Sequence, residues 1–194
     1  ETLHKIVQTF NTEAIPYSVK VCEKLNEAYQ ESMSQLGSTD VAMDNAKITN
    51  TANGCINAIY RLVSSIGKQN QERNKGIILE IEEKVHETLV HSLDKRFTDI
   101  HESIMTCIGA IAYYSDEITS NLWSLFPQLV SLVDNYLDPD IPDYGFIGPG
   151  IIPIMNFMQK DPETFINVTM QDGKTPFDAV VALIIEMFKV SKEC

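Results

Sequence analysis

Apolar side chains recur every three or four positions along nearly the whole chain, which is the spacing of one face of an α-helix. The segment from Ile48 to Ile66 is the most regular, with steps of four, three, four, three and four residues. No segment shows the alternation of a half-buried strand convincingly. The pattern predicts nine helices, at about residues 2–10, 15–36, 48–66, 71–93, 97–114, 119–137, 150–160, 161–165 and 175–188.

Several residues mark the predicted helix ends. Pro16 can stand at a first helical position, where its missing N–H donor is harmless, and Gly67 is a good stop. Asp116 or Thr119 can cap the sixth helix, and Asp161 can cap the short eighth. On the last helix, one face carries four apolar residues, namely Phe177, Val181, Ile184 and Phe188.

Pro127 and Pro153 lie inside two apolar helical stretches, LWSLFPQLVSLV and GIIPIMNFMQ. Proline in a helix interior removes a backbone hydrogen bond and costs roughly 3 kcal/mol. Two helices interrupted in the same way suggest a repeated architecture that uses the bend.

The helices follow one another in pairs of about 45 residues, at positions 15–66, 71–114 and 119–160. Short connections force neighbouring helices to lie antiparallel, and this repeat length is typical of HEAT and armadillo arrays. We therefore predict an all-α protein in which residues 1–194 form one α-solenoid of HEAT-type antiparallel helix pairs. Because the chain begins with Glu1 rather than Met, we expect it to be a piece of a longer protein. A closed helical bundle is the alternative fold.

The net charge of −12 narrows the classes of partner. Nucleic acid is not expected as a direct ligand, because phosphate contacts need clustered lysine and arginine. An acidic surface serves either solubility or the attraction of basic proteins. The longest helical apolar run, AVVALII, is much shorter than the ~20 residues that cross a bilayer, so we expect neither membrane insertion nor a secretion signal.

Four cysteines, Cys22, Cys55, Cys107 and Cys194, stand singly in the sequence. None has the CxxC spacing of a zinc framework or a redox motif. The first three lie within apolar helical patterns, so we expect them in the core of a protein from a reducing compartment.

Three stretches resemble reactive motifs without meeting their requirements. GFIGPG has three glycines but lacks the Lys-Ser/Thr of a phosphate-binding loop, and its glycines instead suggest close helix packing. In HETLVH, His86 and His91 are five residues apart, about 140° around a helix, and cannot share one metal ion. Glu80, Glu82, Glu83 and Glu87 read as a solvated helix face rather than as an acid–base pair. We expect no catalytic residue, cofactor, metal site or enzymatic activity.

Four segments resemble the C-terminal half of receptors of the importin-β superfamily, and the likeness is greatest to the importin-seven/eight subfamily. They are IPYSVKVCEKLNEAYQ, NAIYRLVSSI, NLWSLFPQLVSLVDNYLDPD and GIIPIMNFM. The resemblance covers about residues 3–190 and includes the tryptophan before the first helix-interior proline. It rests on packing motifs, which identify the repeat more specifically than the subfamily.

The resemblance implies a HEAT solenoid in which the bent helix of each pair lies on the convex side. On that basis, the helices at 15–36, 71–93 and 119–137 are outer. Those at 48–66, 97–114, 150–160 and 175–188 are inner.

The resemblance also implies a function. Receptors of this superfamily carry protein cargo between cytoplasm and nucleus, bind the GTPase Ran and contact the phenylalanine-glycine repeats of nucleoporins. Their Ran-binding region lies mainly in N-terminal repeats, which this chain would lack. We therefore expect a shuttling receptor segment whose acidic surface attracts basic cargo such as ribosomal proteins or histones.

Three carboxylates lie off the apolar stripes of helices that we expect to be inner, and they are our candidates for cargo contact: Asp99, Glu102 and Glu186. Ordinary solvated carboxylates are the simpler interpretation of each. Two other functions stay open, a HEAT scaffold that assembles protein complexes without transport and an all-helical enzyme.

Overall fold

The computed structural model describes residues 15–36, 42–69, 72–138 and 144–193, so the predicted helix at 2–10 lies outside the described residues. The described residues contain helices and no strand. The elements are η1 (Ile15–Tyr17), α2 (Ser18–Ser34), α3 (Ala42–Lys68), α4 (Glu72–Ser92), η2 (Thr98–Ile100), α5 (His101–Tyr114), α6 (Ser120–Asn135), α7 (Tyr144–Lys160), α8 (Pro162–Asn167) and α9 (Pro176–Glu193).

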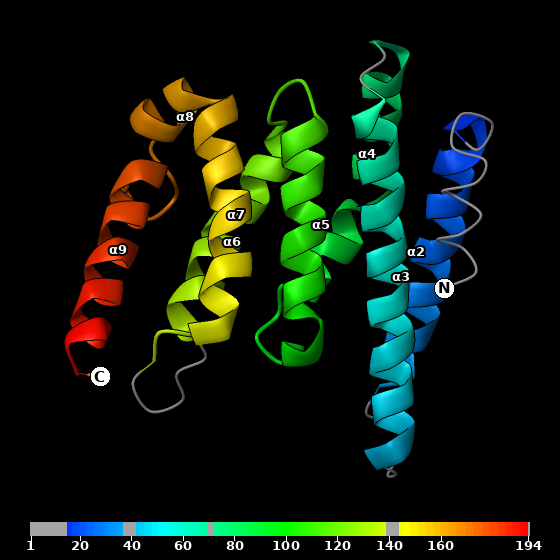
Figure 1. Ribbon diagram of the computed structural model, residues 1–194, viewed down its shortest axis with the longest axis horizontal. Helices are drawn as coiled ribbons and strands as arrows, with labels where there is room; N and C mark the ends of the chain where they lie inside the picture. Colours follow the sequence, from blue (N-terminus) through cyan, green and yellow to red (C-terminus); the bar gives the residue numbers. More distant parts are fainter. Residues whose placement is uncertain (1–14, 37–41, 70–71, 139–143, 194) are drawn as a thin grey trace.

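These helices form two packed rows. Helices α3, α5 and α7 pack side by side in one row, the front row, while α2, α4, α6 and α9 form the rear row. Consecutive helices also pack across the rows, α2 on α3, α4 on α5 and α6 on α7. Helices α2 and α9 lie at opposite ends of the array (Figure 1). The described helices therefore form the predicted solenoid and not a closed bundle, in which the first and last helices would meet.

Helix α9 does not lie where the resemblance placed it. We expected the last helix in the same row as α3, α5 and α7, and this expectation is wrong because α9 packs against α6 and α8 in the rear row. Helix α8 has only six residues, so it is too short to serve as the rear partner of a full helix. The chain instead crosses from α7 to the rear row through α8, and α9 takes the position beside α6.

Two predicted helix caps are confirmed. The side chain of Thr119 accepts a hydrogen bond from the Leu122 N–H at the start of α6, with an N–O distance of 3.1 Å. Asp161 accepts from the Thr164 N–H at 3.1 Å and starts α8, which has a proline in its first turn. Both side chains satisfy backbone donors that the first helical turn leaves unpaired.

The glycine-rich run at residues 145–150 belongs to the first turns of α7, which starts at Tyr144. A Cβ atom at Gly150 would lie 2.6 Å from Cγ2 of Val133 in α6. On the α5 side, the same added atom at Gly109 would lie 3.7 Å from Cα of Pro153. Gly150 therefore lets α7 approach α6 closely, as the sequence suggested, whereas an added Cβ at Gly109 would make only an ordinary van der Waals contact.

Helix-interior prolines occur in both rows, Pro127 in α6 and Pro149 and Pro153 in α7. Proline therefore does not distinguish one row from the other, contrary to the expectation that bent helices form a single layer. Pro127 is exposed, whereas Pro153 is buried against the α5 side of α7.

One continuous apolar core fills the space between the rows. The predicted stripe of α3 is buried from Ile48 to Ile66, and Cys22, Cys55 and Cys107 are buried free thiols, as expected. Among the described helices, none combines the length and apolarity that a membrane-spanning segment requires.

Candidate protein-binding surfaces

The three predicted cargo residues do not form one site. Asp99 in η2 and Glu102 in the first turn of α5 are exposed neighbours at the start of one front-row helix. Glu186 lies on α9 in the rear row, where its carboxylate forms a salt bridge with Lys189 at 2.6 Å. Their contact with cargo stays a prediction.

Exposed charge is distributed unequally between the rows. The described side chains of α3, α5 and α7 include four exposed cations, Lys47, Arg61, Lys68 and Lys160, and a single exposed carboxylate, that of Glu102. The acidic residues gather instead on α2 and α4, which include the acidic cluster that the sequence places at residues 80–87.

The rear-row acids differ in how they are paired. Glu23 forms a salt bridge with Lys84 at 2.9 Å, and Glu27 forms one with Lys24 at 2.5 Å. The remaining exposed carboxylates of α2 and α4 form no salt bridge with a residue that the structure describes, and we call them the acidic surface: Glu31, Glu80, Glu83 and Glu87. This surface is the part of the rear row suited to a basic partner.

Glu82 does not belong to that surface, which corrects our expectation of a solvated face. Its side chain is fully buried, and Oε1 accepts a hydrogen bond from the hydroxyl of Thr119, the cap of α6. Oε2 has no hydrogen-bond partner among the described residues. Burial, followed by the nearby charge of Glu83, raises the pKa of Glu82, and the Thr119 hydrogen bond opposes that rise. The carboxyl group joins two rear-row helices and does not form part of an acid–base pair.

His86 and His91 have different surroundings. Nδ1 of the exposed His91 lies 3.1 Å from the hydroxyl of Tyr29 in α2. Nδ1 of the half-buried His86 has no hydrogen-bond partner in the part of the chain that the structure describes. In that same part, no group of three His, Cys, Asp or Glu residues is arranged to hold a metal ion.

His101 is buried at the junction of three helices. Its Nε2 lies 2.9 Å from the carbonyl oxygen of Asp94, and its Nδ1 lies 2.8 Å from the hydroxyl of Tyr136. The carbonyl can only accept, so Nε2 carries a proton and Nδ1 of the neutral ring accepts from Tyr136. Burial lowers the pKa of His101. These hydrogen bonds hold the ring in place, so that His101 links α5 to Asp94, after α4, and to Tyr136, at the end of α6.

Trp123 links α6 to α7 and α8. The ring is half-buried, and its centroid lies 5.1 Å from that of Phe157 in α7 in an edge-to-face arrangement. Its Nε1–H donates to Oδ2 of Asp161 at 3.0 Å. The same carboxylate therefore caps α8 and ties it to α6.

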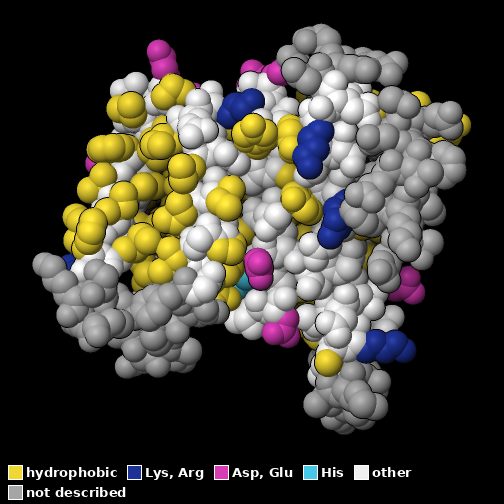
Figure 2. All heavy atoms as spheres, viewed as in Figure 1, with side chains coloured by type: hydrophobic (Ala, Val, Ile, Leu, Met, Phe, Trp, Pro, Cys, Tyr) yellow, Lys and Arg dark blue, Asp and Glu magenta, His cyan; other side chains and the backbone are white. Residues whose placement is uncertain are grey.

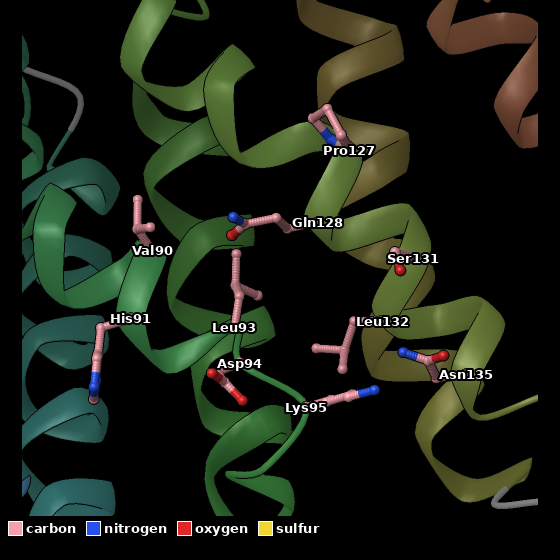
Figure 3. A pocket seen from close by; sticks show the side chains of 10 residues that line it. All are labelled: Val90, His91, Leu93, Asp94, Lys95, Pro127, Gln128, Ser131, Leu132 and Asn135. Atoms are coloured by element: carbon pink, nitrogen blue, oxygen red, sulfur yellow. The ribbon is translucent and has the colours of Figure 1, made fainter. Parts of the chain in front are cut away.

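Grooves lie between successive rear-row helices. The groove between α4 and α6 has a volume of about 560 Å³. Figure 3 shows Leu93 and Asp94, which directly follow α4, across the groove from Gln128 and Leu132 of α6. Grooves of about 430 Å³ and 320 Å³ lie between α2 and α4 and between α6 and α9, and Glu186 lines the last one. Each mixes apolar walls with a few polar groups, a lining suited to side chains of a protein partner.

A further groove of about 410 Å³ crosses the front row between α3, α5 and α7. Tyr60, Tyr113 and Ile152 line it, and Tyr113 is 56% exposed. Aromatic side chains of this kind contribute large contact areas at protein interfaces, so the front row also offers a binding surface.

Comparison with known proteins gives distant relatives that are named as importins or importin-like proteins. An importin beta-like SAD2 homolog of Arabidopsis thaliana is 22% identical over 185 residues, which make up 95% of this chain and 17% of that protein. A probable importin-7 homolog of Dictyostelium discoideum is 22% identical over 169 residues, 85% of this chain and 14% of that protein. The chain thus spans only a small part of each relative.

No protein-family model matches the chain, and no solved structure matches it significantly. The two relatives support a distant relationship with importin-β-like proteins. The importin-seven/eight subfamily stays a prediction.

Proposed function

We propose that this chain is a HEAT-repeat segment of a nuclear transport receptor of the importin-β superfamily, related to importin-seven and importin-eight, and that it binds protein cargo for import through the nuclear pore. The observation that carries this proposal is the similarity to importin-β-like proteins over 95% of the chain. The two-row solenoid supports it, because stacked repeats present a long surface to a large partner.

Binding, without bond-making chemistry, is the mechanism that we propose. Helices α2 to α7 contact neighbours both along their row and across the rows, so small changes of angle between repeats add up to a change of curvature. Such an array can adjust its shape to a folded cargo.

Basic proteins, such as ribosomal proteins or histones, are the cargo class that we propose. The acidic surface of α2 and α4 supplies the attraction, while Asp99, Glu102 and Glu186 are the candidate contacts. Attraction between exposed charges falls as salt shortens the screening length, from about 30 Å at 0.01 M to about 8 Å at 0.15 M.

The remaining partners belong to the whole receptor. We propose that it binds Ran and the phenylalanine-glycine repeats of nucleoporins and shuttles between cytoplasm and nucleus. Because the resemblance places the Ran-binding region in N-terminal repeats, we expect the 194-residue chain alone to respond weakly to Ran-GTP.

A salt-titrated pull-down tests the cargo proposal. The immobilised chain should capture purified core histones most strongly at low salt and release them as salt rises above the physiological concentration. A triple variant, Glu80→Gln with Glu83→Gln and Glu87→Gln, should capture several-fold less. The matched control, Glu117→Gln with Glu163→Gln and Asp172→Asn, removes the same charge from other exposed positions and should behave like the unaltered chain.

Equal loss in both triple variants would refute a localised acidic surface, and capture that ignores salt would refute charge-driven binding. With the whole receptor, binding of Ran-GTP and of phenylalanine-glycine repeats supports transport. Absence of both would instead favour a HEAT scaffold that does not transport its partners.

A further inference from the structure

The groove in the front row lies between three helices that run in the same direction, α3, α5 and α7 (Figure 1). A Cβ atom added to Gly67, near the end of α3, would meet the ring of Tyr114 at the end of α5. Nζ of Lys160, the last residue of α7, donates to the carbonyl oxygen of Ser115, directly after α5, at 2.7 Å. The last turns of the three helices therefore lie at one end of the groove.

The lining of this groove combines exposed apolar surface with amide and hydroxyl groups. Tyr113 of α5 and Ile152 of α7 are each 56% exposed, and Tyr60 of α3 is half-buried. The side-chain amide of Asn156 in α7 donates to the carbonyl oxygen of Gly109 in α5 at 2.8 Å, which ties one wall of the groove to its floor. A groove of about 410 Å³ with this lining can take large apolar side chains of a partner.

Two lysines stand at the same end of the groove. Lys68 follows the lining residue Ser64 by four positions on α3, and Lys160 follows the lining residue Asn156 by four positions on α7. Residues four positions apart are neighbours on one face of a helix, so each lysine lies one turn beyond the lining. Figure 2 shows Lys and Arg side chains on this side of the molecule with hydrophobic side chains between them.

Both ammonium groups can bind carboxylates of a partner. Lys68 and Lys160 are exposed, and neither forms a salt bridge with a residue that the structure describes. Lys160 uses one of its three N–H donors on Ser115 and keeps two. The one exposed carboxylate among the described front-row side chains, that of Glu102, lies four residues before the lining residue Thr106 and hence at the other end of the groove. The lysine end is therefore locally positive, although the chain carries a net charge of −12.

We propose that the front-row groove binds an acidic peptide segment of a partner protein. The carboxylates of the segment contact Lys68 and Lys160, and an adjacent apolar side chain lies in the groove against Tyr113 and Ile152. This partner is opposite in charge to the basic cargo that we propose for the acidic surface, and the two surfaces belong to different rows.

A nucleic acid could also offer negative charge and flat apolar groups to the same side chains. Its phosphates require clustered cations along the whole contact, whereas the groove has lysines at one end and Glu102 at the other. The net charge of −12 also repels a long polyanion more strongly than a short segment with a few carboxylates. The observations therefore favour a peptide.

Fluorescence anisotropy with labelled peptides tests the chemistry of the partner. The probe is a short peptide that carries a run of aspartates followed by a tryptophan and a leucine. One control peptide has asparagine in place of every aspartate, and the other has serine in place of the tryptophan and the leucine. At 0.15 M salt, where the screening length is about 8 Å, the probe should bind at least about ten-fold more tightly than either control, because carboxylates and apolar side chains both contribute.

Variants with matched controls test the location. Lys68→Glu should weaken probe binding by at least about ten-fold, because an attraction becomes a repulsion. Lys95→Glu makes the same change of charge at an exposed position on the rear-row groove between α4 and α6 and should have little effect. Tyr113→Ser should also weaken binding, whereas Tyr17→Ser should not, although Tyr17 in η1 is 64% exposed and Tyr113 is 56% exposed. Circular dichroism shows whether each variant is folded.

Three outcomes would overturn the proposal. They are the absence of saturable probe binding up to about 1 mM, a weak interaction by any measure, equal binding of the probe and a control peptide, and equal losses in Lys68→Glu and Lys95→Glu. Single-stranded DNA that bound more tightly than the probe and was lost in Lys68→Glu would assign the groove to nucleic acid instead. The variant with Glu80→Gln, Glu83→Gln and Glu87→Gln should bind the probe no more weakly than the unaltered chain, so this test and the capture of basic cargo can fail independently.

Discussion

Glu82 is an ionisable residue on a helical stripe that is otherwise apolar. It lies four residues after Ile78 and three before Val85, both fully or almost fully buried. Its position in the stripe was therefore visible in the sequence, although its acidic neighbours at 80, 83 and 87 suggested a solvated face. Its partner Thr119 lies 37 residues further along the chain, and helical periodicity carries no information about such a contact.

We predict that Glu82→Gln stabilises the fold at neutral pH. The pKa of Glu82 is raised in the folded protein, so its carboxyl group favours folding when protonated and opposes folding as pH rises through the folded pKa. Glutamine keeps an oxygen that accepts from Thr119 and carries no charge. The free energy of unfolding at pH 7 should rise by on the order of 1 kcal/mol, since the desolvation of an ion is removed. Urea unfolding followed by circular dichroism measures it.

The pH dependence distinguishes this cause from a packing effect. Below the ordinary glutamate pKa of about 4.3, Glu82 is protonated in both states, so the difference between variant and unaltered chain should largely disappear. Glu80→Gln, at an exposed position on the same helix, should change stability little at either pH. A gain that is equal at both pH values would contradict the assigned cause.

At the scale of single elements, the sequence patterns predict which residues share a helix face but not what covers that face. The stripe of α3 from Ile48 to Ile66 is buried as expected, whereas the similar stripe of α9 from Phe177 to Phe188 is exposed. Both have steps of three and four residues. The difference lies in their neighbours, since α3 packs against α2 and α5 while α9 packs against α6 and α8 through its other face.

Glycine at position 150 sets how closely α7 approaches α6. An added Cβ would meet Val133 at 2.6 Å and the Phe146 ring at 3.3 Å. We predict that Gly150→Ala destabilises the protein by roughly 1–3 kcal/mol, the usual range for overpacking. Thermal and urea unfolding measure this change.

Gly54→Ala is the matched control for Gly150→Ala. Gly54 lies within α3, and an added Cβ has nothing within 4 Å. Alanine should therefore stabilise α3 by roughly 0.5–1 kcal/mol through its helix propensity. If both variants changed stability in the same direction, close packing at Gly150 would not explain its effect.

At the scale of the whole molecule, the solenoid and its pair length followed from the sequence, because both depend on local periodicity and short connections. The location of charge did not follow. The net charge of −12 is a property of the composition, but the assignment of exposed residues to the front or rear row depends on contacts between distant helices. Asp99 and Glu102 lie near each other because they are close in the sequence, whereas Glu186 lies on α9 in the other row.

A stack of repeats should not be equally stable along its length. Helix α5 packs against α3, α4 and α7, and most of its residues are buried, whereas α9 packs against α6 and α8 at the end of the array. Amides exchange with solvent when their helix opens locally. We predict that the opening of α9 costs at least about 2 kcal/mol less free energy than the opening of α5. Native-state hydrogen exchange of the 194-residue chain measures both. Equal protection of the two helices would show that the array unfolds as one cooperative unit.

The common direction of α3, α5 and α7 has an electrostatic consequence. Their peptide dipoles point the same way, so partial negative charge collects along the edge where these helices end and partial positive charge along the edge where they begin. Lys68 and Lys160 stand on the first edge, where the Lys160 ammonium donates to the Ser115 carbonyl at 2.7 Å, and Asp99 and Glu102 stand on the second. Side-chain charge thus opposes the macrodipoles at both margins, and an elongated partner would meet cations along one margin and carboxylates along the other.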